Sequence, residues 1–108
     1  MKKRTLLLLI LLLAVMVLAQ DKTSPIVVKE ATISTGVVVV TADMGGKSVE
    51  LQCTQSMPDC ISLKNGKYVL VQLPKNHGMY DCQNVDVFPE GADPATAHKL
   101  GEYCLMSK

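Results

Sequence analysis

The sequence of 108 residues contains no tryptophan, and it has only four aromatic side chains, three Tyr and one Phe. The absence of Trp argues against a true immunoglobulin domain, whose core normally packs a Trp against a disulfide. No serine stands in a Gly-x-Ser-x-Gly elbow, which disfavours the hydrolases that use this motif. The chain also lacks a linker, an internal repeat or a low-complexity tract. We therefore expect one small domain after any targeting segment.

The N-terminus combines a basic head with a short apolar run. Lys2, Lys3 and Arg4 precede 14 residues, 6–19, that are all apolar and end at Ala19. This pattern is typical of a secretory signal that is cleaved after a small residue, whereas a permanent helical span needs about 20 apolar residues. The sequence predicts a signal peptide over residues 1–19 and a mature domain over 20–108. The mature protein is then secreted or periplasmic, without a stable membrane span.

The charge of the predicted mature chain differs from that of the whole sequence. Residues 20–108 carry eight Lys or Arg and ten Asp or Glu, so their formal charge is −2, compared with +1 for all 108 residues. A mildly acidic domain lacks the basic face that binds phosphate backbones, which argues against a nucleic-acid partner. A chain of this size also buries a modest core and usually needs covalent staples.

Four cysteines, at positions 53, 60, 82 and 104, supply candidate staples. An even number of cysteines in a small exported chain favours two disulfides over free thiols. Three pairings are possible, and the short polar segment from Cys53 to Cys60, which contains a Pro, favours joining these two. Cys82 then pairs with Cys104. A zinc site is disfavoured because six residues separate the first two cysteines, beyond the roughly two to four that zinc ligands usually show.

The apolar residues repeat with the period of a β-strand. In segment 47–53, Val49, Leu51 and Cys53 alternate with polar residues, which indicates one buried and one solvated face. The β-branched segment 36–42 precedes it, and the glycines within 43–46 suit a tight turn between the two. Asn65 and Gly66 predict a second hairpin between 61–63 and 67–73. We expect further strands at 26–33, 84–88 and 102–106.

One short helix is predicted near the C-terminus. Asp93 can cap it, Pro94 suits its first turn, and Gly101 can end it. The sequence therefore predicts a mostly β fold: a small disulfide-stapled barrel or sandwich of six or seven short strands with this one helix.

The loop of residues 75–83 concentrates the side chains that are suited to recognition. We predict a binding surface that includes His77, Met79, Tyr80 and Asp81, with Tyr80 as its apolar anchor and His77 as a polar or pH-sensitive contact. Tyr80 could instead pack against a disulfide. No catalytic residue is predicted, because Cys82 is assigned to a disulfide and therefore offers no thiolate nucleophile.

Acidic and metal-binding alternatives remain open at the same loop. Asp81 and Asp86 flank it, and Asp59 or Glu102 could approach them, but general acid and base catalysis also needs a cleft and separated pKa values. The acids do not follow the spacing of a calcium loop. His77 and Met79 form an H-x-M pair that suits copper, which would need further ligands drawn from Met44, Met57, Met106 and His98. We predict no metal and no cofactor.

These observations favour a secreted, non-enzymatic binding or accessory module that recognises an unknown protein or envelope ligand. The alternatives are a cell-envelope assembly component that offers a β edge to a partner strand and an exported copper-binding protein. An enzyme is the least favoured reading.

Overall fold

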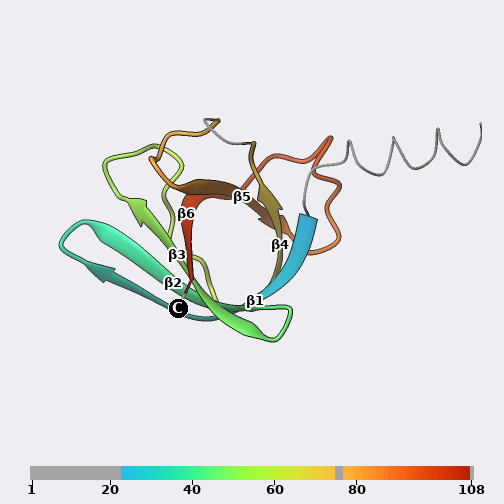
Figure 1. Cartoon of the computed structure of the whole chain (residues 1–108), viewed down its shortest axis with the longest axis horizontal. Coiled ribbons are helices and arrows are strands. Elements are labelled where there is room, and N and C mark those ends of the chain that lie inside the picture. Colours follow the sequence, from blue (N-terminus) through green and yellow to red (C-terminus); the bar gives the residue numbers. More distant parts are fainter. Residues whose placement is uncertain (1–22, 75–76, 108) are drawn as a thin grey trace, which may run out of the picture.

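The computed structural model describes residues 23–74 and 77–107, and in this part of the chain six antiparallel strands close into a barrel (Figure 1). The predicted signal segment 1–19 lies outside the described residues. The strands follow one another around the barrel in the order β1-β2-β3-β6-β5-β4. Their bounds are β1 (Thr23–Ser34), β2 (Val37–Met44), β3 (Lys47–Thr54), β4 (Gly66–Gln72), β5 (Gln83–Pro89) and β6 (Gly101–Ser107). The closed barrel confirms the predicted β class and decides between barrel and sandwich.

Two tight turns join the first three strands. Thr35 and Gly36 have φ values of 49° and 80°, and Gly45 and Gly46 have values of 58° and 83°. Positive φ at both central residues matches the right-handed twist of the flanking strands in a two-residue hairpin. The predicted turn within 43–46 is therefore confirmed, and an additional hairpin turn joins β1 to β2.

The hairpin predicted at Asn65 and Gly66 is wrong. Residues 60–64 form no strand, and Gly66 instead starts β4, which pairs with Val28 of β1. Segment 60–64 is held against the barrel by tertiary contacts: Leu63 belongs to the buried core, and the Tyr103 hydroxyl donates to the Ile61 carbonyl at 2.8 Å. These contacts to a distant strand outweigh the local turn preference of Asn-Gly.

The predicted C-terminal helix is also wrong, since the described residues contain no helix. The cap itself is present, because the Asp93 carboxylate accepts from the Ala95 amide at 3.0 Å and the Asp93 carbonyl accepts from the Ala97 amide at 2.8 Å. The turn does not propagate, because the Leu100 amide donates to the Val87 carbonyl of β5 at 2.7 Å. The chain thus rejoins the sheet.

Gly101, which was predicted to end the helix, is the first residue of β6. A Cβ there would lie 2.9 Å from the Asp59 carbonyl oxygen and 2.7 Å from the Tyr103 hydroxyl. Glycine is therefore required because another backbone segment approaches closely at this point.

The barrel interior is filled by alternate side chains from all six strands. Strand β1 closes the barrel because its first half, Thr23–Val28, pairs with β4, and its second half continues along β2 after a register shift between Val28 and Glu30. Such a bulge bends the strand and increases its twist. The buried core residues are Ile26, Val28, Val38, Val40, Ala42, Val49, Leu51, Cys53, Leu63, Leu70, Val85, Val87 and Tyr103.

Candidate binding groove

The outer face of β5 and β6 is covered by loops. Asn84 and Glu102 face outward, because their chain neighbours Val85 and Tyr103 belong to the interior, yet each is only 4% exposed. Both side chains make hydrogen bonds to the loop of residues 77–82. This outer layer therefore buries polar groups, in contrast to the apolar interior.

Asn84 organises the loop. Its side-chain amide donates to the carbonyl oxygens of Tyr80 at 2.6 Å and Cys82 at 3.1 Å, and its carbonyl oxygen accepts from the Tyr80 amide at 2.9 Å. Gly78 lies so close that an added Cβ would overlap the Asn84 side chain, and its φ of 118° disfavours other residues. This role of Asn84 is not among the predictions from the sequence, where its position in an alternating strand is the one signal for it.

A charged cluster lies beside Asn84. The Lys99 ammonium is 3.1 Å from a Glu102 carboxylate oxygen, 3.4 Å from Asp86 and 3.7 Å from Asp59. The other Glu102 oxygen accepts from the Met79 amide at 2.7 Å. Glu102 thus ties the loop to Lys99. Three of the acids considered from the sequence converge here, and Asp81 is not among them.

Burial and neighbouring charges shift the pKa values of this cluster in opposite directions. Burial raises the pKa of Asp86 above its ordinary value, and the nearby Lys99 only partly offsets this effect. For Lys99, burial lowers the pKa, but the hydrogen bond to Glu102 and the charge of Asp86 outweigh it, so the pKa is raised. At neutral pH Lys99 is therefore the cation that balances this acidic site.

The four predicted binding residues divide into two pairs. Tyr80 and Asp81 line a hollow, whereas His77 and Met79 are not part of its wall. His77 is exposed and Met79 is half-buried. Tyr80 is half-buried, packs against the core, and accepts a hydrogen bond from the Thr54 amide at 3.3 Å. Tyr80, which was predicted to be an exposed aromatic anchor, is thus a partly packed side chain in the wall of the hollow. Asp81, in contrast, is exposed.

The hollow beside Tyr80, which we call the outer groove, has a volume of about 260 Å³. Its floor comes from neighbouring strands, because Gln52 of β3 pairs with Cys104 of β6. Its lining residues are Val37, Gln52, Cys53, Thr54, Tyr80, Asp81, Cys82 and Cys104.

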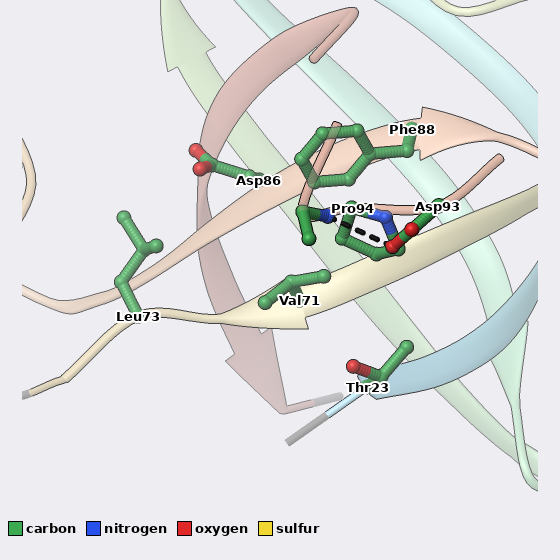
Figure 2. A pocket seen from close by; sticks show the side chains of 8 residues that line it. Thr23, Val71, Leu73, Asp86, Phe88, Asp93 and Pro94 are labelled. Carbon is green, nitrogen blue, oxygen red and sulfur yellow. Dashed lines mark hydrogen bonds between the residues drawn. The ribbon is translucent and has the colours of Figure 1, made fainter. Parts of the chain in front are cut away.

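A second hollow of about 450 Å³ is lined mainly by residues of β1, β4 and β5 and of segment 93–95 (Figure 2). Phe88 and Pro94 both line it, and Asp86 and Asp93 are well separated along it. Both carboxylates have internal partners, Lys99 for Asp86 and the Ala95 amide for Asp93. The remaining lining residues are Thr23, Val71, Leu73 and Ala95.

Both predicted disulfides are present. Cys53 joins Cys60 with a Cα–Cα distance of 5.5 Å, and Cys82 joins Cys104 at 5.8 Å. The second disulfide forms part of the groove wall.

Within residues 23–74 and 77–107, no group of three or more His, Cys, Asp or Glu side chains is arranged to hold a metal ion. The same residues include no helix with the length and apolar character required to span a membrane. Comparison of the chain with protein-family models, with curated proteins and with solved structures finds no match.

Proposed function

We propose that this protein is an exported, non-enzymatic binding module and that the outer groove holds a segment of a protein partner. The observation that carries this proposal is the groove itself: Tyr80 and Asp81 line a hollow whose wall is fixed by the Cys82–Cys104 disulfide. A site that is already ordered loses less conformational entropy when it binds. The two disulfides suit the oxidising compartment to which the predicted signal peptide directs the chain.

The chemistry of the groove favours recognition over catalysis. Val37 and the Tyr80 ring offer apolar contact, and Gln52 and Thr54 offer polar groups beside it. None of the described residues that line it is His, Lys or Arg, so among them a general acid or base would have to come from Asp81 or the Tyr80 hydroxyl. In the larger hollow, the internal partners of Asp86 and Asp93 weigh against a pair of catalytic carboxylates.

The charge of the groove suggests the kind of partner segment. Asp81 is exposed and is the only charged residue among the described residues that line the groove. We expect an extended peptide segment that carries a basic side chain opposite Asp81 and an aliphatic side chain against Tyr80. Charge complementarity of this kind contributes to specificity and to the association rate.

Site-specific photocrosslinking tests the proposal. A photoreactive amino acid at position 81 should give a crosslinked partner in an exporting host, and the same group at Glu90, an exposed acid outside the groove, should not. Asp81→Lys should weaken binding of the purified partner about tenfold or more, compared with Glu90→Lys, by reversing the charge of the groove. Equal crosslinking from both positions would refute the groove as the contact surface.

A strand-addition site is a second candidate, favoured by one observation. Residues Glu30 to Ser34 of β1 pair only with β2 among the described strands, and Ile33 on this segment is 54% exposed. An apolar edge that lacks a neighbour can accept a strand from a partner. If a partner strand adds to this edge, Ile33→Lys should abolish its binding and leave binding at the outer groove intact. Loss of groove binding with retained binding of the partner strand in Ile33→Lys would exclude the edge.

A further inference from the structure

The two disulfides differ in their exposure to solvent. Cys53 is 2% exposed and belongs to the barrel core, and its partner Cys60 packs against that core. Cys82 is exposed, and Cys104 is half-buried in the wall of the outer groove. Thiol–disulfide exchange requires access of an attacking thiolate to one sulfur, so these two bonds should differ in reactivity.

We propose that the Cys82–Cys104 disulfide is a thiol-exchange site and that an external thiol enters through the outer groove to attack Cys82. Cys82 precedes β5, whereas Cys104 lies within β6 between β3 and β5, where it pairs with Gln52 and Asn84. Cys82 is the more exposed residue of the two. The groove adjoins both cysteines and provides space for the incoming thiol.

The exchange proceeds in two balanced steps. An external thiolate forms a bond to the Cys82 sulfur, the Cys82–Cys104 bond breaks, and its electron pair leaves on the Cys104 sulfur, which takes up a proton from water. A second external thiolate then attacks the external sulfur of the mixed disulfide and releases Cys82 as a thiolate. Two external thiols are oxidised to one disulfide, and the protein disulfide is reduced by two electrons.

The surrounding fold allows this bond to open without unfolding the barrel. Strands β5 and β6 are also joined by their backbone pairing, which runs from Gln83 with Leu105 to Val87 with Gly101. The loop is also held by Asn84 and Glu102. Opening of Cys53–Cys60, in contrast, requires a thiol to reach either Cys53, which is 2% exposed, or Cys60, which is half-buried, and neither is as exposed as Cys82. The exposed disulfide should therefore be reduced first while the chain stays folded.

Partial reduction of the native protein tests this order. After limited treatment with dithiothreitol, alkylation and peptide mapping should find modified Cys82 and Cys104 beside an intact Cys53–Cys60 bond. The rate of opening should differ by about tenfold or more between the two disulfides. Hydrogen exchange should show that β5 and β6 remain protected. Opening of Cys53–Cys60 first, or of both bonds together with loss of protection, would overturn the proposal.

Two matched variants test which sulfur is attacked. Cys104→Ser leaves Cys82 as the thiol, and Cys82→Ser leaves Cys104. With oxidised glutathione, the Cys104→Ser protein should form a mixed disulfide about tenfold faster than the Cys82→Ser protein, with both shown to be folded by circular dichroism. Equal or reversed rates would refute attack at Cys82.

Parallel reductions of the wild-type protein by reduced glutathione and by a thioredoxin-type protein dithiol separate the two sources of thiol. Reduction of Cys82–Cys104 by either reagent supports the proposed exchange site and identifies the class of thiol that reacts there. Failure of both, under conditions that reduce an exposed control disulfide, would refute it.

Discussion

The interior of the barrel and the loop layer over β5 and β6 are built from the same strands but depend on different interactions. Val85 and Tyr103 point inward and join an apolar core, whereas their neighbours Asn84 and Glu102 point outward and are buried by hydrogen bonds. Apolar packing has little directional preference, so the interior requires side chains of suitable volume. The outer layer requires particular partners, because an unsatisfied buried polar group destabilises the fold.

The candidate binding groove lies on the outer side because the two regions are filled differently. A six-stranded barrel leaves its interior filled with side chains, and 13 of the described residues form the buried core. The outer loops, in contrast, enclose hollows of about 260 and 450 Å³. A barrel with an apolar interior thus carries loops whose polar contacts shape the surface on which we propose that recognition takes place.

Truncation in the interior should have the largest effect. Leu51 has no exposed surface, so Leu51→Ala should lower the free energy of unfolding by about 3 kcal/mol through lost apolar contact and cavity formation. Urea denaturation followed by circular dichroism measures the change. Ile33→Ala, at a largely exposed position, serves as the control and should change stability little. Equal effects of the two variants would contradict the assignment of Leu51 to the core.

Removal of the central side chain of the loop layer should have an intermediate and local effect. Asn84→Ala leaves the backbone groups of Tyr80 and Cys82 without their side-chain partner, and we expect a loss of about 2 kcal/mol. Hydrogen exchange should show faster opening of residues 77–82 and little change in β2 and β3. A uniform increase over all strands would instead show that the loop layer and the interior form one cooperative unit.

Neutralisation of Asp86 should have the smallest effect on the free energy of unfolding, and it should stabilise the protein, whereas the two truncations destabilise it. Because burial raises the pKa of Asp86, the folded state keeps a proton at pH values where the unfolded chain has lost it. Its contribution to stability is therefore present below pH about 4 and is lost as the pH rises through the raised pKa. Asp86→Asn should be slightly more stable than the wild type at pH 7, with the difference vanishing near pH 3.

Thermal denaturation across this pH range measures the difference between the two proteins. Asp93→Asn provides the comparison, because Asp93 lines the same hollow but lies outside the Lys99 cluster. A wild type that is more stable than Asp86→Asn at pH 7 would show that the ion pair with Lys99 outweighs the desolvation of Asp86.

The sequence alone determined the β class, the hairpin at residues 43–46 and both disulfide pairs. Alternation of apolar residues and glycine at positive φ act over a few residues, so these signals can be read locally. The short segment between Cys53 and Cys60 made one pairing simple to predict, and the other pairing followed from it.

Tertiary structure decided the remaining features. Strand pairing overrode the capped turn at Asp93, and core contacts drew segment 60–64 away from the hairpin that Asn65 and Gly66 predicted. The convergence of Asp59, Asp86 and Glu102 on Lys99 likewise depends on β5, β6 and two loops meeting in space. The physical reason is the same in each case. Hydrogen bonds and burial between residues far apart in the chain contribute more free energy than the local preference of a short segment for a turn or a helix, so the tertiary contacts decide the structure.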